Sequence, residues 1–350
     1  MEKPATMMPK DILPKFLLVL CYFMVTGCQG LNQERVQKYR ETKMLMGTFV
    51  NIDVCGTLHD KLRVETSYQA VWERLGAISW KMNVFDDRSD VAKLNHSNQV
   101  PVSVGKDTYY VLENSMRFSR LTGGVFDISV YPLIGLWRES EKQNQFPSEE
   151  QIQKVRMMVG SQNIQLLGND QVRIGRAGTK IDLGGIAKGY AVDEAARIFR
   201  EHGVYDFFID AGGDVYAGGN NCLGKLWRVG IRDPRDKSKI LDVVEVMNQA
   251  VMTSGNYEQY YTIGGKRWSH IINPNTGRPQ KEVTSSTVIT PTAMEGDALA
   301  TGLCVLGGQA GREFMDARGE NYASLVLIKS GDGELRRFSS RTYKKLVVQF

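Results

Sequence analysis

The sequence contains few cysteines and only a mild excess of positive charge. Of 350 residues, five are cysteine, and the formal net charge at pH 7 is +5. Acidic and basic residues are mixed in tracts such as Asp233-Pro234-Arg235-Asp236-Lys237, which is typical of a solvent-exposed loop. The sequence also lacks a cluster of lysine and arginine with interleaved aromatic residues. We therefore do not expect nucleic acid as a partner.

The cysteines form neither a metal-binding pattern nor a complete disulfide framework. Cys21 and Cys28 belong to the N-terminal segment, which leaves Cys55, Cys222 and Cys304. None of these three has the spacing of metal ligands, and an odd number cannot pair completely. We expect them to be core or loop thiols, and one disulfide is the alternative that the sequence leaves open.

The N-terminal apolar stretch, residues 16–25, is too short to span a membrane, which takes roughly 20 apolar residues. It follows three lysines and ends at Thr26-Gly27-Cys28. A basic, then apolar, then small-residue order is typical of a secretory signal. A cysteine directly after a small residue also resembles a bacterial lipobox, although Val25 stands where leucine is commoner.

These features predict an exported protein that is lipid-anchored to a bacterial membrane, on its periplasmic or extracytoplasmic face. We expect residues 1–27 to be a lipoprotein signal peptide, Cys28 to be the lipidated residue and residues 28–42 to be a polar tether. Residues 43–350 would form the functional domain. A cleaved, soluble secreted protein and a retained anchor are the alternatives.

Beyond the tether, predicted helices and strands occur in runs rather than in strict alternation. No internal repeat, low-complexity tract or proline-rich linker divides the chain. Runs of strands favour an α+β fold over a doubly wound parallel sheet, so a Rossmann fold is not expected. The periodicity of apolar residues predicts helices at 62–82, 107–121, 187–202 and 292–306 and one that begins at 147, a hairpin at 164–174, and strands at 207–209, 214–216, 227–231, 257–261, 283–289, 323–327 and 345–348.

The segment 180–193, Lys-Ile-Asp-Leu-Gly-Gly-Ile-Ala-Lys-Gly-Tyr-Ala-Val-Asp, is the strongest indication of a binding site. A strand-like start, a carboxylate, paired glycines and a helix start follow one another within it. Backbone N–H groups of a glycine-rich turn and a helix N-terminus can donate to an anion, and Lys188 adds positive charge. This pattern indicates a nucleotide phosphate site. Taken alone, it is equally compatible with an ordinary strand-to-helix connection.

Five further motifs accompany this segment in order along the chain. They are Met46-Gly47-Thr48 and the segments 123–127, 210–214, 269–279 and 295–301. Together the six motifs resemble the ApbE family of FAD:protein FMN transferases, from about Lys43 to the last strands. The resemblance implies an α+β flavin transferase fold with mixed, largely antiparallel sheets and packed helices.

Asp297 and Thr301 are four residues apart in the helix expected at 292–306, which places their oxygen atoms on one face, one turn apart. A hard cation such as Mg²⁺ binds oxygen ligands from one or two carboxylates and from substrate phosphates. Taken alone, an aspartate and a threonine at this spacing are more often surface or packing residues. The family resemblance implies that both are metal ligands, together with the backbone carbonyl of Gly185.

The resemblance also implies a set of contacts to FAD. Phe85 stands where the family often has tyrosine, and either ring could stack on the isoalloxazine, although the tyrosine hydroxyl is missing here. Without the family, Phe85 is interpreted as a core aromatic residue. The positions that resemble the family's flavin contacts are Met46, Phe85, Val125, Phe126, Asp127, Asp182, Lys188 and Ile272.

His270 is the candidate general base. It belongs to a stretch that resembles the family's Ser-His-Ile-Ile-Asp-Pro-x-Thr-Gly segment, with Asn273 in place of the usual aspartate. A lone histidine is usually structural, yet its pKa suits proton transfer near neutrality. The family's aspartate either orients the histidine or belongs only to a turn, and the sequence leaves both interpretations open.

The resemblance implies Mg²⁺-dependent transfer of FMN from FAD to a serine or threonine hydroxyl of an acceptor protein, with release of AMP. Acceptors would be flavoprotein subunits of membrane redox complexes. One alternative is a Mg²⁺-dependent FAD pyrophosphatase that yields FMN and AMP, and the other is a non-catalytic FAD-binding lipoprotein. Phe85 cannot bind a metal or water, which favours transfer, and a metal-and-base pair has no use in a storage protein.

Overall fold

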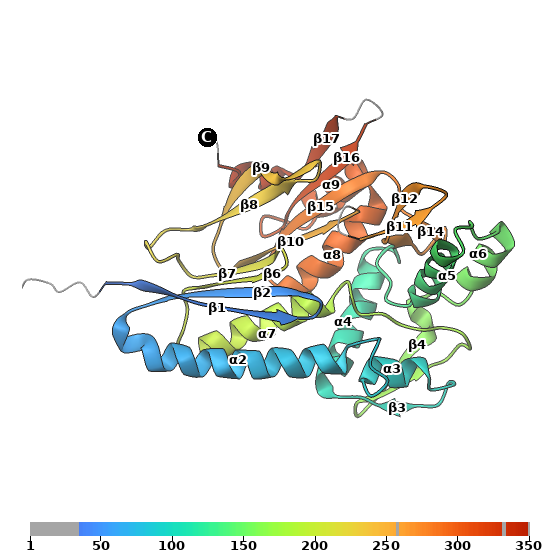
Figure 1. The fold of residues 1–350 in the computed structure, drawn as a ribbon, viewed down its shortest axis with the longest axis horizontal. Coiled ribbons are helices and arrows are strands. Elements are labelled where there is room, and N and C mark those ends of the chain that lie inside the picture. The colour runs from blue at the N-terminus through green and yellow to red at the C-terminus, as the bar shows by residue number, and fades with distance from the viewer. Residues whose placement is uncertain (1–34, 257–258, 331–333, 349–350) are drawn as a thin grey trace, which may run out of the picture. The chain divides into compact units, whose positions relative to one another are not determined.

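The computed structural model describes residues 35–256, 259–330 and 334–348 (Figure 1). The predicted signal peptide, Cys28, the first part of the tether and the first two residues of the strand expected at 257–261 lie outside the described residues. From Val36 onward the described residues belong to one unit. Within them, no helix combines the length and the apolar character that a membrane crossing requires.

An eight-stranded antiparallel sheet organises this unit, with strand order β1-β2-β6-β7-β10-β15-β16-β17. This confirms the α+β expectation with largely antiparallel sheets. The strands are β1 Gln37–Leu45, β2 Thr48–Gly56, β6 Phe207–Ala211, β7 Asp214–Gly218, β10 Gln249–Gly255, β15 Val283–Thr290, β16 Ala323–Lys329 and β17 Leu335–Ser339. Smaller sheets consist of β3 Val102–Ser103 with β5 Gln171–Ile174 and β4 Ile164–Gly168, β8 Trp227–Asp233 with β9 Asp236–Val246, β11 Tyr260–Ile263 with β12 Lys266–Ser269, and β13 Ile272–Asn273 with β14 Arg278–Pro279.

Both faces of the large sheet are covered, because apolar residues point to both sides of its central strands. On one face, Val50, Ile52 and Val54 of β2 pack into a core shared with the long helices α2 (Lys61–Lys81) and α7 (Ala187–Glu201). On the other face, the hairpin β8–β9 covers β7, β10 and β16. Figure 1 shows α2 and α7 below β1 and β2, and β8 and β9 above them.

All five predicted helices are confirmed, and three α-helices among the described residues lie where neither a helix nor a strand was predicted. The prediction at 62–82 corresponds to α2, that at 107–121 to α4 (Lys106–Leu121), that from 147 to α6 (Glu149–Arg156), and the last two to α7 and α8 (Ala293–Leu306). Ser148 and Gln151 form a capping box at the start of α6, as the sequence there indicates. The missed helices are α3 Asp90–Asn95, α5 Tyr131–Lys142 and α9 Gly308–Asp316, beside two short 3₁₀ turns at Leu58–Asp60 and Ser161–Asn163.

The expected strand at 345–348 is wrong. The Ser340 side chain accepts a hydrogen bond from the Tyr343 backbone N–H and starts helix α10, Arg341–Leu346. Only Val347 pairs with a strand, through one bridge to Val244. A short apolar run does not distinguish the end of a helix from a strand, and the serine cap decides the outcome here.

The end of the expected tether also belongs to the fold. Residues 37–42 lie in β1 and pair with residues 51–56 of β2. The tether prediction of 28–42 was therefore too long, because an alternating polar edge strand has the composition of a linker.

Two of the three expected thiols form a disulfide, which corrects the cysteine prediction. Cys55 of β2 is bonded to Cys222 in the connection between β7 and β8, whereas Cys304 is a buried free thiol. The two bonded residues are 167 positions apart in the sequence. Their proximity arises from sheet topology, because β6 pairs with both β2 and β7, and spacing along the chain cannot reveal it.

The helices α7 and α8 are in direct backbone contact at Gly189. A Cβ atom at this position would lie 2.3 Å from the Ala293 carbonyl oxygen and 2.6 Å from the Met294 Cα. Backbone atoms cannot yield to such a contact as a flexible side chain can. Glycine at position 189 is therefore what allows the two helices to cross at this distance.

We expect Gly189→Ala to lower the free energy of unfolding by about 1–3 kcal/mol, because the added methyl group overpacks the helix crossing. Urea or thermal unfolding measures the loss. Gly76→Ala in α2 is the matched control, since nothing lies within 4 Å of a Cβ placed there, and it should stabilise the helix by about 0.5–1 kcal/mol. Equal stability of the two variants would contradict the crossing described here.

Candidate functional site

A cavity of about 810 Å³ opens where the start of α7 meets α8. Its volume is in the range of cofactor and small-molecule sites. Every site residue predicted from the sequence lines it, except Cys28, which lies outside the described residues. The lining set comprises Met46, Phe85, Val125, Phe126, Asp127, Asp182, Gly185, Lys188, His270, Ile272, Asp297 and Thr301.

The glycine-rich segment reaches α7 without forming the strand expected at its start. Only Lys180 makes a single bridge, to Val130. The loop is instead held by Asn95, whose side chain accepts from the Ile181 N–H and donates to the Ile181 carbonyl. The Asp182 carboxylate accepts a 2.8 Å hydrogen bond from the Gly184 N–H, and burial raises the pKa of Asp182. Hydrogen bonds to the Asn95 and Asp182 side chains thus hold this segment in place of strand pairing.

Lys188, in the first turn of α7, forms an ion pair with Asp214 of β7. Asp214 is buried and also accepts a 3.1 Å hydrogen bond from the Thr253 N–H of β10. The ammonium group is therefore held at a fixed place in the cavity wall by two strands of the large sheet.

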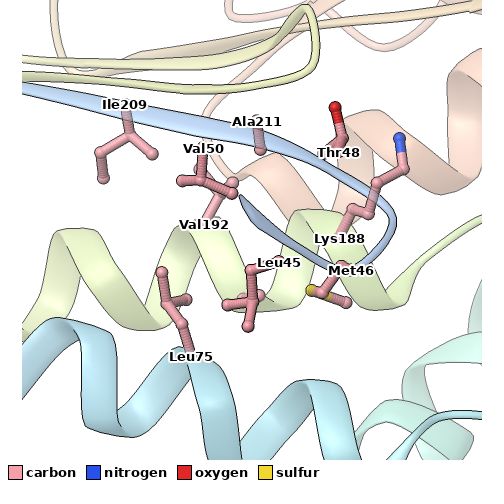
Figure 2. Close-up of a pocket in the computed structure, with 10 residues that line it drawn as sticks. Leu45, Met46, Thr48, Val50, Leu75, Lys188, Val192, Ile209 and Ala211 are labelled. Atoms are coloured by element: carbon pink, nitrogen blue, oxygen red, sulfur yellow. The ribbon is translucent and has the colours of Figure 1, made fainter. Parts of the chain in front are cut away.

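A second, very small gap lies under the Lys188 side chain, between α7 and the β1–β2 hairpin (Figure 2). Its volume of about 10 Å³ and its mainly apolar lining, which includes Leu45, Val50 and Val192, leave no place for a ligand. Figure 2 shows the Lys188 ammonium and the Thr48 hydroxyl pointing the same way, away from this apolar cluster. The gap is thus a packing defect, and the polar ends of Lys188 and Thr48 point away from it.

The predicted metal ligands lie together between α7 and α8. Asp297 is buried, and its Oδ2 accepts a 3.0 Å hydrogen bond from the Gly189 N–H. The Thr301 hydroxyl lies 3.3 Å from the Ser254 hydroxyl. A Cβ at Gly185 would lie 3.2 Å from Thr301 Oγ1, so the Gly185 backbone is a direct neighbour of Thr301.

This donor set fits a hard cation. Among the described residues, no group of three or more His, Cys, Asp or Glu side chains could hold a metal ion, so a softer, multi-histidine or cysteine site is not formed there. One carboxylate, one hydroxyl and one backbone carbonyl are oxygen donors that suit Mg²⁺, which commonly retains water or takes phosphate oxygens as its other ligands.

His270 has one ring nitrogen fixed by the backbone. Nδ1 lies 2.8 Å from the Gln259 carbonyl oxygen, and because a carbonyl only accepts, Nδ1 carries the proton and Nε2 keeps its lone pair. Burial and, to a smaller extent, the positive charge of Lys188 lower the pKa of His270, against the opposing effect of the Gln259 hydrogen bond. A neutral imidazole with an accepting Nε2 is the form that a general base requires.

Asn273 serves a turn. Its side-chain oxygen accepts a 2.9 Å hydrogen bond from the Asn275 N–H, and its carbonyl accepts one from the Gly277 N–H at 2.8 Å. This geometry favours the interpretation in which the family's aspartate at this position belongs only to a turn.

Phe85 is not a core residue, because 70% of its surface is exposed. The Arg138 guanidinium lies 5.3 Å from the centre of its ring, a cation–π distance. The interpretation as a core aromatic was therefore wrong. An exposed ring at the wall of a cavity offers a flat apolar surface for stacking.

The Asp127 carboxylate is engaged by its own loop and by the 3₁₀ turn that begins at Ser161. It accepts hydrogen bonds from the Ser129 N–H at 2.9 Å, the Ser129 hydroxyl at 2.6 Å and the Ser161 N–H at 2.8 Å. Burial nevertheless raises the pKa of Asp127. These bonds shape the loop that presents Val125 and Phe126, so a contact from residue 127 to a ligand would be best made by its backbone.

Several lining residues were missed by the sequence analysis. Arg138 belongs to α5, which was itself not predicted, although Pro132 near its start is a signal for a helix N-terminus. Arg138 exerts a charge effect that lowers the pKa values of Asp182 and Tyr261, while burial, the larger effect, keeps both raised. Thr253 and Ser254 of β10 carry no distinguishing pattern, and only the sheet order brings them to the site.

Comparison with known proteins agrees with this geometry. The model of the ApbE family matches residues 46–326. The chain is 32% identical over 344 residues to the FAD:protein FMN transferase of Escherichia coli K12, covering 95% of this chain and 96% of that protein. It is 31% identical over 311 residues to the enzyme of that name from Salmonella typhimurium, with 87% of each covered.

Solved structures give the same result. The ApbE protein of Thermotoga maritima superposes with a TM-score of 0.80 at 34% identity, covering 89% of this chain and all of that one. The flavin transferase ApbE of Vibrio cholerae gives 0.78 at 28% identity, covering 89% and 99%. Because the family model and these relatives span nearly all of the described fold, the chain belongs to the ApbE family.

Proposed function

We propose that this protein transfers the FMN half of FAD to a serine or threonine hydroxyl of an acceptor protein and releases AMP, with Mg²⁺ bound in the site. Relatives 31% and 32% identical to it carry the name FAD:protein FMN transferase, which supports transfer as the reaction class. The observation that carries the proposal is that one cavity gathers a fixed cation at Lys188, oxygen donors at Asp297 and Thr301, and a basic nitrogen at His270.

The proposed reaction is a displacement at the FMN-side phosphorus. A new bond forms between the acceptor oxygen and this phosphorus, and the bond from the phosphorus to the bridging oxygen breaks, so that AMP leaves. The hydroxyl proton passes to Nε2 of His270, while its Nδ1–H continues to donate to the Gln259 carbonyl. Such a reaction requires positioning and charge stabilisation more than covalent help from the enzyme.

The charge stabilisation is assigned to two groups of residues. The Gly185 carbonyl, Asp297 and Thr301 would hold Mg²⁺, which when bound there would neutralise charge on phosphate oxygens. Lys188 supplies a second positive charge, held in place by Asp214. Because Asp214 is buried and fixed by Thr253, the lysine is positioned before substrate arrives, which reduces the cost of binding.

The ring end of FAD is assigned to the wall formed by Phe85 and Arg138. The exposed Phe85 ring provides a stacking surface. The Arg138 guanidinium beside it offers planar donors that suit carbonyl or anionic groups. The remaining proposed flavin contacts are Met46, Val125, Phe126, Asp127, Asp182 and Ile272.

We also propose that the protein acts outside the cytoplasm, anchored through lipid on Cys28, on acceptor flavoprotein subunits of membrane redox complexes. The N-terminal sequence supports export. The Cys55–Cys222 disulfide adds independent support, because structural disulfides persist mainly in oxidising compartments.

The transferase proposal is tested with the soluble form that begins at Gln29, incubated with FAD, Mg²⁺ and a flavin-acceptor domain. We expect AMP together with a fluorescent acceptor band in a denaturing gel. Asp297→Ala should abolish both products, and His270→Ala should lower the rate by about 10²–10⁴-fold. Asp236→Ala, on the β8–β9 hairpin, is the control and should retain full activity.

The other outcomes identify the alternatives. AMP and free FMN without a labelled acceptor would make the protein a pyrophosphatase. Bound FAD without any AMP would leave a flavin-binding protein without catalysis.

The lowered pKa of His270 predicts the pH dependence. Because the base must be neutral, activity should fall only as the pH drops below about 6.5, the ordinary histidine value.

Lys188→Gln removes a positive charge that lowers the pKa of His270, so this pKa should rise in the variant. NMR titration of the four histidines, assigned with His270→Gln, measures the shift, and Lys61→Gln on the surface of α2 should leave it unchanged. A lower pKa in Lys188→Gln would refute the electrostatic role.

The anchor is tested by Cys28→Ser in the full-length chain expressed in a bacterium that processes lipoproteins. We expect the wild-type protein in the membrane fraction, labelled by a palmitate analogue. The variant should lose the label and leave the membrane fraction after a salt wash. A variant that keeps the label would show that Cys28 is not the lipidated residue.

A further inference from the structure

Asp193 is the last residue of the glycine-rich segment, and it does not line the cavity. Its carboxylate instead accepts two hydrogen bonds from the neighbouring helix, from the Ala293 N–H at 2.7 Å and from the Met294 N–H at 2.9 Å. These are the first two N–H groups of α8, which have no partner within their own helix. Asp193 on α7 therefore caps α8.

The cap that α8 could supply for itself is not used. Thr292 occupies the N-cap position but makes no capping hydrogen bond with its side chain, although threonine is a favourable residue there. Burial of the Asp193 carboxyl group raises its pKa to about 7, in spite of the two backbone N–H donors. Burying a carboxylate costs free energy. Besides capping α8, the Asp193 carboxylate links α7 to α8.

A second link runs in the opposite direction. The Gly189 N–H of α7 donates to Asp297 Oδ2 of α8 at 3.0 Å. Gly189 and Asp193 are one turn apart on α7, as Ala293 and Asp297 are on α8, so each pair lies on one helix face. The two links, one turn apart, fix both the rotation and the axial position of α8 relative to α7. Gly189 allows the backbones to approach closely enough for both.

We propose that Asp193 is a positioning residue for the metal-binding oxygens. By capping α8 from α7, it fixes the register in which Asp297 and Thr301 face Gly185, in the turn just before α7. This inference rests on the proposed function, which assigns these three residues to Mg²⁺. Residues that orient metal ligands without touching the metal commonly change its affinity by about 10–100-fold when they are replaced.

The test measures Mn²⁺ affinity of the soluble protein from the EPR signal of free Mn²⁺, with no nucleotide present, and the unfolding temperature of each variant. We expect Asp193→Ala to weaken Mn²⁺ binding by about 10–100-fold. Asp193→Asn keeps the shape and one acceptor oxygen, so its loss should be smaller. Ser148→Ala removes the side-chain cap of α6 and is the matched control: it should lower the unfolding temperature without changing Mn²⁺ affinity.

Asp297→Ala separates the inference from the function on which it rests. If Asp297→Ala abolishes Mn²⁺ binding while both Asp193 variants bind as the wild type does, the positioning role is overturned and the metal site stands. If Asp297→Ala binds Mn²⁺ normally, the metal assignment fails and the positioning role fails with it. Should Asp193→Ala not fold, Asp193→Asn decides the question. Weakened Mn²⁺ binding by Asp193→Asn supports the positioning role, and wild-type Mn²⁺ binding overturns it.

Discussion

The crossing of α7 and α8 at Gly189 is the constraint on which the candidate site depends. A side chain there would meet the Ala293 carbonyl at 2.3 Å, so the helices would have to separate or shift. Gly185 lies in the turn just before α7, Lys188 lies in its first turn, and α8 carries Asp297 and Thr301. Only a close crossing brings the proposed phosphate cation and the proposed metal ligands into one cavity, because side chains as short as aspartate and threonine reach only a few ångströms.

The large sheet supplies the second fixed element. Asp214 of β7 holds Lys188, and Ser254 of β10 lies beside Thr301, so the proposed phosphate end is built on helices and strands. The proposed ring end is built differently, since Phe85 lies in a loop and is largely exposed. Rigid elements hold reacting groups more accurately than loops do, whereas loops tolerate variation. This division suits an enzyme in which the chemistry at the phosphorus is constant and the surroundings of the ring and acceptor can differ.

The sequence predicted the fold class, most long helices and the motif residues that line the cavity, since amphipathic periodicity and ordered motifs are local signals. It did not predict the Cys55–Cys222 disulfide or the contribution of Ser254, because both arise from strand order, which joins residues far apart in the chain. It misassigned 345–348 because a serine cap, rather than the apolar run, decided the local structure. Arg138 was missed because its helix was missed. Local sequence patterns thus located the motifs, whereas the strand order determined which distant residues lie beside them.

The proposed donor set also constrains how metal and substrate bind. Asp297 is the one carboxylate among the proposed ligands, and a hard cation held by a single carboxylate completes its shell with water or with substrate oxygens. Within the proposed function, the phosphates of FAD take the place of water, and Lys188, already paired with Asp214, does not by itself balance the charge of a pyrophosphate. Metal and FAD should therefore strengthen each other's binding, and by linkage the two effects must be equal in size. Capping of α8 by Asp193 then bears on substrate affinity as well, because it acts on the ligand geometry through which this coupling passes.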